Sequence, residues 1–252
     1  METEYFPSGP AIQITGEQRI LVVADIHMGI ESDLRLHGVH LQSRGKERID
    51  RLSDLVQEIS PDILLMLGDV KHRVPGTSWQ EFRELPSLFS NLRKHTTIRV
   101  TPGNHDPGIE EFLKPEELLP KEGSILDGVG VMHGHTRPDP SLAGHLILTG
   151  HHHPVASLTD EVGIALRSPC YVLAELRNEV FDSPQSDDTK TRILMVPAFN
   201  EFSGYGIEKT FRSPFSPLSR AVVIETAECL LADGTYGGEL SSVIRHEHPG
   251  CT

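Results

Sequence analysis

Five short apolar segments, each followed at once by a polar motif, constrain the fold of this chain most strongly. The segments are residues 19–24, 62–67, 96–100, 128–132 and 146–148. A short continuous apolar run bounded by turn residues is typical of a strand that is buried on both faces. In layered α/β proteins, ligands gather at the carboxyl ends of such strands. The pattern therefore predicts a site assembled from strand ends that are far apart in the sequence.

Two amphipathic helices are expected among these strands. Apolar residues recur at helical spacing over 49–59 and 82–92, and Pro86 is expected to kink or delay the second helix. From Val155 onward the strand-like runs are separated by turn-rich segments, which predicts a second, more antiparallel sheet packed on the first. The expected fold is therefore α/β, with a two-sheet β-sandwich flanked by helices.

Composition limits the partners and the compartment. Lys and Arg number 23 and Asp and Glu 36, so the formal net charge of −13 makes the bulk surface repel nucleic acid and anionic membranes. A phosphate-bearing partner must then be captured locally, by metal ions or a small basic patch. The three cysteines fit no disulfide framework, and no stretch is apolar enough for a membrane span. We expect a cytoplasmic protein with one domain over 1–240 and a flexible tail at 241–252.

Histidine clustering identifies the candidate chemistry, because most of the 14 histidines crowd into a few short segments. In this composition an Asp-x-His pair is expected about 0.8 times by chance, whereas Gly-Asn-His-Asp is expected about 0.001 times, so residues 103–106 carry the strong signal. The five strand-end motifs are Asp25-Ile-His27, Gly68-Asp69, Gly103-Asn-His-Asp106, His133-Gly-His135 and Gly150-His-His-His153.

Carboxylate, imidazole and amide oxygen together favour a two-metal site. These ligands suit Mn, Fe, Zn, Co or Ni, and so many imidazoles argue against dedicated Mg or Ca sites. Asp25 and His27 are two residues apart at one strand end, so their side chains face the same way and can bind one ion. A carboxylate such as Asp69 can bridge two ions. Two ions roughly 3.5 to 4 Å apart can bind a hydroxide and clamp the attacking and leaving oxygens at phosphorus. The expected cofactors are two divalent transition-metal ions, manganese first among them.

The ordered motifs over residues 19–154 resemble those of the calcineurin-like metallophosphoesterases. The resemblance implies one metal held by Asp25, His27 and His153, a second held by Asn104, His133 and His151, and Asp69 between them. It also implies that His105 contacts the scissile phosphate as general acid toward the leaving oxygen, with Asp106 orienting it.

The residues that flank the motifs are similar to archaeal SbcD-related phosphoesterases and to bacterial phosphoesterases associated with a DNA ligase. This resemblance includes DIHMGIE, GDVKH, GHHHP, SPC and VPAFNEFSG, and extends through about residue 207. It implies that His72 assists catalysis and that the setting is DNA repair, with a DNA-repair protein as partner. The sequence stops before the long capping and DNA-binding region of those nucleases, and Lys71 replaces their usual apolar residue, which argues against duplex DNA as substrate.

The function expected is hydrolysis of phosphodiester bonds by metal-bound hydroxide. The substrate class implied by the resemblance is nucleic acid or nucleotide, and the acidic surface favours short or single-stranded ends. Two alternatives remain: a small-molecule phosphomonoesterase or pyrophosphatase with the same metal centre, and a non-catalytic scaffold for a protein partner.

Three cations beside the motifs, Lys71, Arg73 and Arg137, are candidates to bind substrate phosphates, although ordinary solvated charge explains them equally well. Two histidines of the motifs have weaker assignments. His135 either adjoins the metal ligands or exchanges roles with His133, and alternation along the chain points His152 away from its neighbours.

Overall fold

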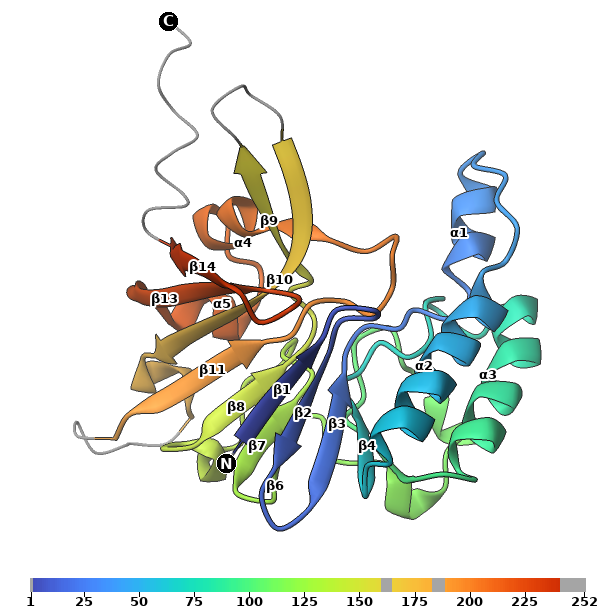
Figure 1. Cartoon of the computed structure of the whole chain (residues 1–252), viewed down its shortest axis with the longest axis horizontal. Coiled ribbons are helices and arrows are strands. Elements are labelled where there is room, and N and C mark those ends of the chain that lie inside the picture. Colours follow the sequence, from blue (N-terminus) through green and yellow to red (C-terminus); the bar gives the residue numbers. More distant parts are fainter. Residues whose placement is uncertain (1, 160–164, 183–188, 241–252) are drawn as a thin grey trace, which may run out of the picture.

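The computed structural model describes residues 2–159, 165–182 and 189–240 of the chain. Two β-sheets pack face to face, and helices cover their outer faces (Figure 1), which confirms the predicted α/β sandwich. The tail predicted at 241–252 lies outside the described residues. Within the described part of the chain, no helix has the length and apolar content that crossing a bilayer requires.

The first sheet has five strands in the order β1-β2-β3-β4-β5. They span Glu2–Phe6, Ala11–Thr15, Arg19–Val23, Ile63–Met66 and Thr97–Val100. Strands β3, β4 and β5 are parallel, so their carboxyl ends, with the first three motifs, lie along one edge of the sheet as predicted. Strands β1 and β2 add an antiparallel hairpin that the sequence pattern does not predict, because β1 has no apolar run.

The second sheet contains nine strands among the described residues, and it begins earlier in the chain than predicted. The strands are β6 (Ser124–Leu126), β7 (Val129–Met132), β8 (Leu146–Thr149), β9 (Pro154–Thr159), β10 (Ala165–Leu176), β11 (Thr191–Met195), β12 (Tyr205–Gly206), β13 (Val222–Leu231) and β14 (Tyr236–Glu239). Strand β8 pairs in parallel with both β7 and β11, so the last two motif strands belong here and the predicted division at Val155 is wrong. Their apolar runs resemble those of β3 and β4, and local pattern alone does not reveal the partner strand.

Three apolar layers hold the sandwich together. The layer between the sheets includes Ile12, Val22, Leu65, Val131, Leu148, Tyr171 and Leu194. Helices α2 (Gly45–Ile59) and α3 (Trp79–Leu92) cover the outer face of the first sheet, and α4 (Ile207–Arg212) and α5 (Pro217–Ala221) cover that of the second. A further helix, α1 (Ile30–Leu36), follows the first motif.

Helix α3 contains Pro86 without being delayed by it. The helix begins at a capping box, in which the Ser78 hydroxyl accepts a hydrogen bond from the amide of Glu81, and continues on both sides of the proline. Pro86 lies on the exposed face, where the carbonyl group left without an amide partner can bond to water. The expected delay is therefore wrong.

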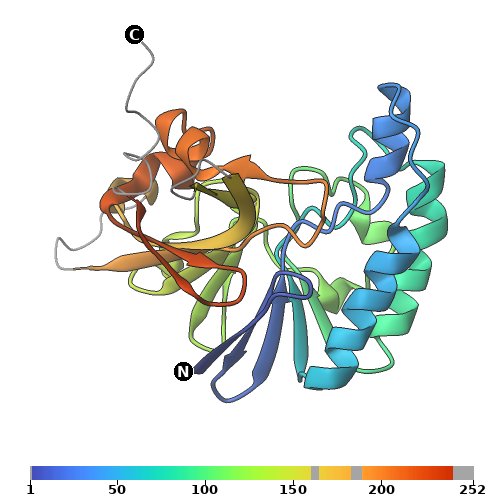
Figure 2. The ribbon, with the colours of Figure 1, turned by 45° about the horizontal axis from the view of Figure 1, so that its top comes forward.

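A long connection between β11 and β12 ties the two sheets together beside the motifs. It reaches from the second sheet toward α1 and α2 (Figure 2, orange). There the carboxylate of Glu201 lies 3.1 Å from Nε of the buried Arg48, and Nδ2 of Asn200 donates to the carbonyl oxygen of Ile26 at 2.9 Å. The strand end that carries the first motif is thus held from both sheets.

Candidate metal centre

The motif residues have an unusual backbone conformation. Seven described residues other than glycine have a positive φ, and five of them are Asp25, His27, Asp69, His151 and His153, with φ between 42° and 68°. For such residues this left-handed region costs roughly 1 kcal/mol or more and is concentrated at functional sites. The fold therefore holds these side chains in place against a local conformational cost.

A first group of four buried side chains gathers at the ends of β3, β4 and β8. In Asp25, His27, Asp69 and His153, one ligand atom of each residue lies within 4.8 Å of the others. Oδ1 of Asp25 is 3.1 Å from Nε2 of His153, and Oδ2 of Asp69 is 3.7 Å from Nε2 of His27. Two carboxylates and two imidazoles at this spacing can hold one divalent metal ion.

A second group shares Asp69 with the first and adds His133 and His151. Nε2 of His133 is 3.5 Å from Oδ2 of Asp69 and 3.2 Å from Oδ1 of Asn104. Nδ1 of His133 donates to the carbonyl oxygen of Leu67 at 2.8 Å, so Nε2 is the nitrogen that can bind a metal once it has lost its proton. Metal-binding histidines usually have such a partner on the other ring nitrogen, so the donor set fits a divalent ion.

Two further motif histidines, His135 and His152, lie beside the groups. His133, and not His135, joins Asp69; the His135 ring lies 5.2 Å from that of His133. His152 is turned away, as predicted: its Nδ1 donates to the carbonyl oxygen of Gly150 at 2.9 Å, and its Nε2 accepts from the Ser216 hydroxyl at 2.8 Å.

A third group, formed by His27, His72 and His105, adjoins the first. The rings of His72 and His105 stack with centroids 5.1 Å apart, and Nδ1 of His105 donates to the carbonyl oxygen of His72. Asp33 lies 3.7 Å from Nε2 of His72. Sequence reasoning missed Asp33, because its position on α1, outside every strand-end motif, gives no signal.

Asp106 acts on the backbone of its own motif. Its carboxylate accepts hydrogen bonds from the amides of Lys71 at 3.1 Å and Gly103 at 2.8 Å. Burial and the nearby Asp69 raise the pKa of Asp106 to about 6. Asp106 thus holds the loop that carries His105, while Nδ1 of the His105 ring donates to the His72 carbonyl. The expectation that Asp106 orients His105 stays a prediction.

The three candidate phosphate-binding cations have different environments. Lys71 is completely buried, and its ammonium group donates to the carbonyl oxygens of Arg73 and Gly76. These contacts argue against its predicted role in substrate binding, which stays a prediction. Arg73 is exposed beside His72. Arg137 donates to the carboxylate of Asp182 at 2.9 Å.

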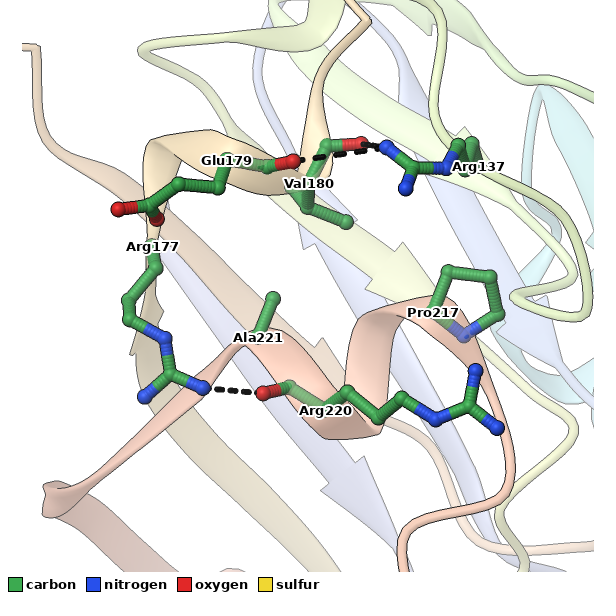
Figure 3. Close-up of a pocket in the computed structure, with 7 residues that line it drawn as sticks. All are labelled: Arg137, Arg177, Glu179, Val180, Pro217, Arg220 and Ala221. Atoms are coloured by element: carbon green, nitrogen blue, oxygen red, sulfur yellow. Dashed lines mark hydrogen bonds between the residues drawn. The ribbon is translucent and has the colours of Figure 1, made fainter.

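Arg137 lines a separate pocket of about 320 Å³ on the second sheet (Figure 3). Arg177 and Arg220 also line this pocket, and the side chain of Arg177 donates to the backbone carbonyl of Arg220. Phosphate binding by Arg137 therefore stays a prediction, and the phosphate would bind in this pocket.

Replacing Lys71 by methionine is expected to lower stability more than substrate affinity. Two loop carbonyl oxygens would lose their buried donor, which costs about 1–3 kcal/mol of unfolding free energy. The exposed Arg73→Ala change is the matched control and should stay within about 0.5 kcal/mol of the parent. Urea unfolding of the metal-free proteins measures the difference, and equal stability of the two variants would contradict the buried role of Lys71.

Binding of a divalent metal near neutral pH is expected to release about one proton from His133. Burial alone would lower the pKa of His133, but Asp69 and Asp25 raise it to about 9, and a metal-binding imidazole must lose this proton. Below pH 9 the affinity should therefore rise by about tenfold per pH unit. Titration calorimetry in two buffers of different ionisation enthalpy counts the protons, and no release would contradict this assignment.

The same shift gives the sign of the stability change in the metal-free protein. The folded-state pKa of His133 lies above the unfolded value of 6.5. Its stabilising pairing with Asp69 is therefore fully present below pH 6.5 and is lost as the pH rises through 9.

The fold and the site together define a class of protein: an α/β sandwich that presents carboxylates and imidazoles for divalent metals at its strand ends. Residues 18–169 match the calcineurin-like phosphoesterases, and the chain belongs to that family. It is a metal-dependent phosphoesterase.

The solved structures that the chain matches include a nuclease and a phosphoesterase. Nuclease MPE of Pseudomonas putida is 21% identical, with a TM-score of 0.55 over 92% of this chain and 98% of that chain. Yfce, a phosphoesterase from E. coli, is 15% identical, with a TM-score of 0.39 over 71% of this chain and 79% of that chain. At this identity the first comparison establishes a shared fold.

Proposed function

We propose that this phosphoesterase hydrolyses phosphodiester bonds in nucleic-acid or nucleotide substrates with two divalent transition-metal ions. The observation that carries the proposal is the pair of overlapping metal-binding groups that share Asp69. Manganese is the first candidate, followed by Fe, Zn, Co and Ni. The same proposal includes three features that come from the sequence. They are a cytoplasmic DNA-repair setting, a repair protein as partner, and a single domain over 1–240.

Seven side chains would hold the two ions. Asp25, His27 and His153 would bind one, Asn104, His133 and His151 the other, and Asp69 both. When bound, such ions lower the pKa of water and stabilise the charge that develops on phosphoryl oxygens. The protein contributes the left-handed strand ends, and the Leu67 carbonyl fixes the tautomer of His133.

His105 would protonate the leaving oxygen. The His72 carbonyl can only accept, so Nδ1 of His105 carries a proton and Nε2 is left to exchange one with substrate. The amide of His105 donates to Oδ1 of Asp69 at 2.8 Å, which ties the acid to the metal groups. His72 stacks against the ring of His105 and would assist it.

Short or single-stranded nucleic acid is the favoured substrate. The net charge of −13 opposes the extended phosphate contacts that a long duplex needs. A nuclease activity of the P. putida protein, which has a similar fold, is consistent with this substrate class.

The test compares bis-p-nitrophenyl phosphate with p-nitrophenyl phosphate in the presence of manganese. We expect faster cleavage of the diester than of the monoester. In a second assay, we expect cleavage of a labelled single-stranded oligonucleotide. Turnover of the monoester alone would replace it with a small-molecule phosphatase. Turnover of neither substrate by protein with bound metal would favour a non-catalytic scaffold.

A further inference from the structure

Two aromatic rings lie against the metal-site histidines while remaining open to solvent. Tyr205, in β12, is 44% exposed, and Phe215, between α4 and α5, is 43% exposed. Isolated exposed aromatic residues are common on protein surfaces and need no explanation. These two adjoin one another, with ring centroids 5.9 Å apart, and both contact the site.

Each ring is fixed to a different part of the metal centre. The Tyr205 ring stacks on His153 at 5.7 Å and an interplanar angle of 29°, and its backbone amide donates to the carbonyl oxygen of His153 at 2.9 Å. The Phe215 ring lies 5.2 Å from that of His151 and 5.5 Å from that of His152. The pair therefore forms an apolar border beside the last motif, which we call the aromatic border.

The surroundings of the aromatic border suit a planar group attached to a phosphate. The ammonium group of the exposed Lys209 lies 6.0 Å from the Tyr205 ring centroid and supplies a local positive charge on an acidic protein. In a nucleotide, each phosphate is joined through a sugar to a planar base. Stacking of bases on aromatic side chains adds affinity without many basic residues, and it requires bases that are not already paired and stacked in a duplex.

We propose that Tyr205 and Phe215 form a stacking platform for an unpaired nucleobase next to the phosphodiester at the metal centre. The inference rests on the proposed function and deepens it, because it selects single-stranded nucleic acid or a free nucleotide ester over base-free phosphodiesters. The rings are binding residues in this account, and the chemistry stays with the metal groups and His105.

The experiment measures kcat/KM with manganese on two matched substrates. One is a dinucleoside monophosphate that carries both bases, and the other is the same diester with both bases replaced by hydrogen. The parent protein should prefer the first by about 5- to 140-fold for each stacked base. The double variant Tyr205→Leu/Phe215→Leu should reduce this ratio to about 1. Tyr205→Phe should preserve it.

Tyr236→Leu is the matched control, since Tyr236 is an exposed ring on β14. This variant should keep the parent ratio. A ratio near 1 in the parent would overturn the inference. An equal loss on both substrates in the double variant would also overturn it, because the rings would then only hold the histidines in position.

A binding measurement separates this inference from the proposed function. Fluorescence of a single-stranded oligonucleotide containing 2-aminopurine is followed with protein and manganese. Quenching by the parent but not by the double variant supports stacking even if no diester is cleaved, in which case only the proposed function fails. Diester cleavage without any quenching or base preference overturns the stacking platform and leaves the proposed function standing.

Discussion

Replacing Asp69 by asparagine is expected to lower kcat/KM for a phosphodiester by about 10³-fold or more. Oδ2 of Asp69 lies 3.7 Å from Nε2 of His27 and 3.5 Å from Nε2 of His133, so one carboxylate serves both metal-binding groups. A neutral amide would remove the negative charge that the two metal-binding groups share, and the charge stabilisation that bound metals would supply is worth several kcal/mol in such reactions. The loss of activity should accompany weaker binding of at least one ion.

The fold should survive this change. Oδ1 of Asp69 accepts the amide of His105, and an asparagine oxygen can accept the same hydrogen bond. Asp50→Asn, at an exposed position on α2, is the matched control and should keep parent activity. Far-ultraviolet circular dichroism checks the fold, and a steady-state assay measures kcat/KM. A kcat/KM of Asp69→Asn within tenfold of the parent value would contradict the shared role of this carboxylate.

His105→Ala is expected to lower activity by an amount that depends on the leaving group. General acid catalysis contributes about 10²- to 10⁴-fold when the leaving oxygen needs a proton. A nucleoside alkoxide needs one, whereas p-nitrophenolate is a stable anion. The loss of kcat/KM should therefore be at least about tenfold larger for a dinucleoside monophosphate than for bis-p-nitrophenyl phosphate.

The control for this prediction is His37→Ala, because the His37 side chain is 74% exposed after α1. It should leave both rates unchanged. Equal losses on the two substrates with His105→Ala would show that His105 binds the phosphate without donating a proton. No loss on either substrate would remove it from the reaction.

Most of the site could be located from the sequence because strand ends are local features. An apolar run that stops at Asp25 or Asp69 places that side chain at the edge of a buried sheet, and parallel pairing brings the edges together. The structure gathers Asp25, Asp69 and His133 as expected. Their assignment as metal ligands stays a prediction.

Other features depend on tertiary contacts that no local pattern contains. The runs at β7 and β8 predict strands, but only their pairing with β11 assigns them to the second sheet. Lys71 stands between two site residues in the sequence, yet its side chain turns into the loop at 73–76. Tyr205 follows the last motif by some fifty residues and returns to it through strand pairing with Pro154.

The most direct test of the central claim is a manganese titration of metal-free protein while cleavage of bis-p-nitrophenyl phosphate is followed. We expect no cleavage without metal and a rate that saturates when two ions are bound per chain, because Asp69 belongs to two groups of ligands. Full cleavage by the metal-free protein, or a saturated cleavage rate with no metal bound at Asp69, would contradict the proposed metal dependence.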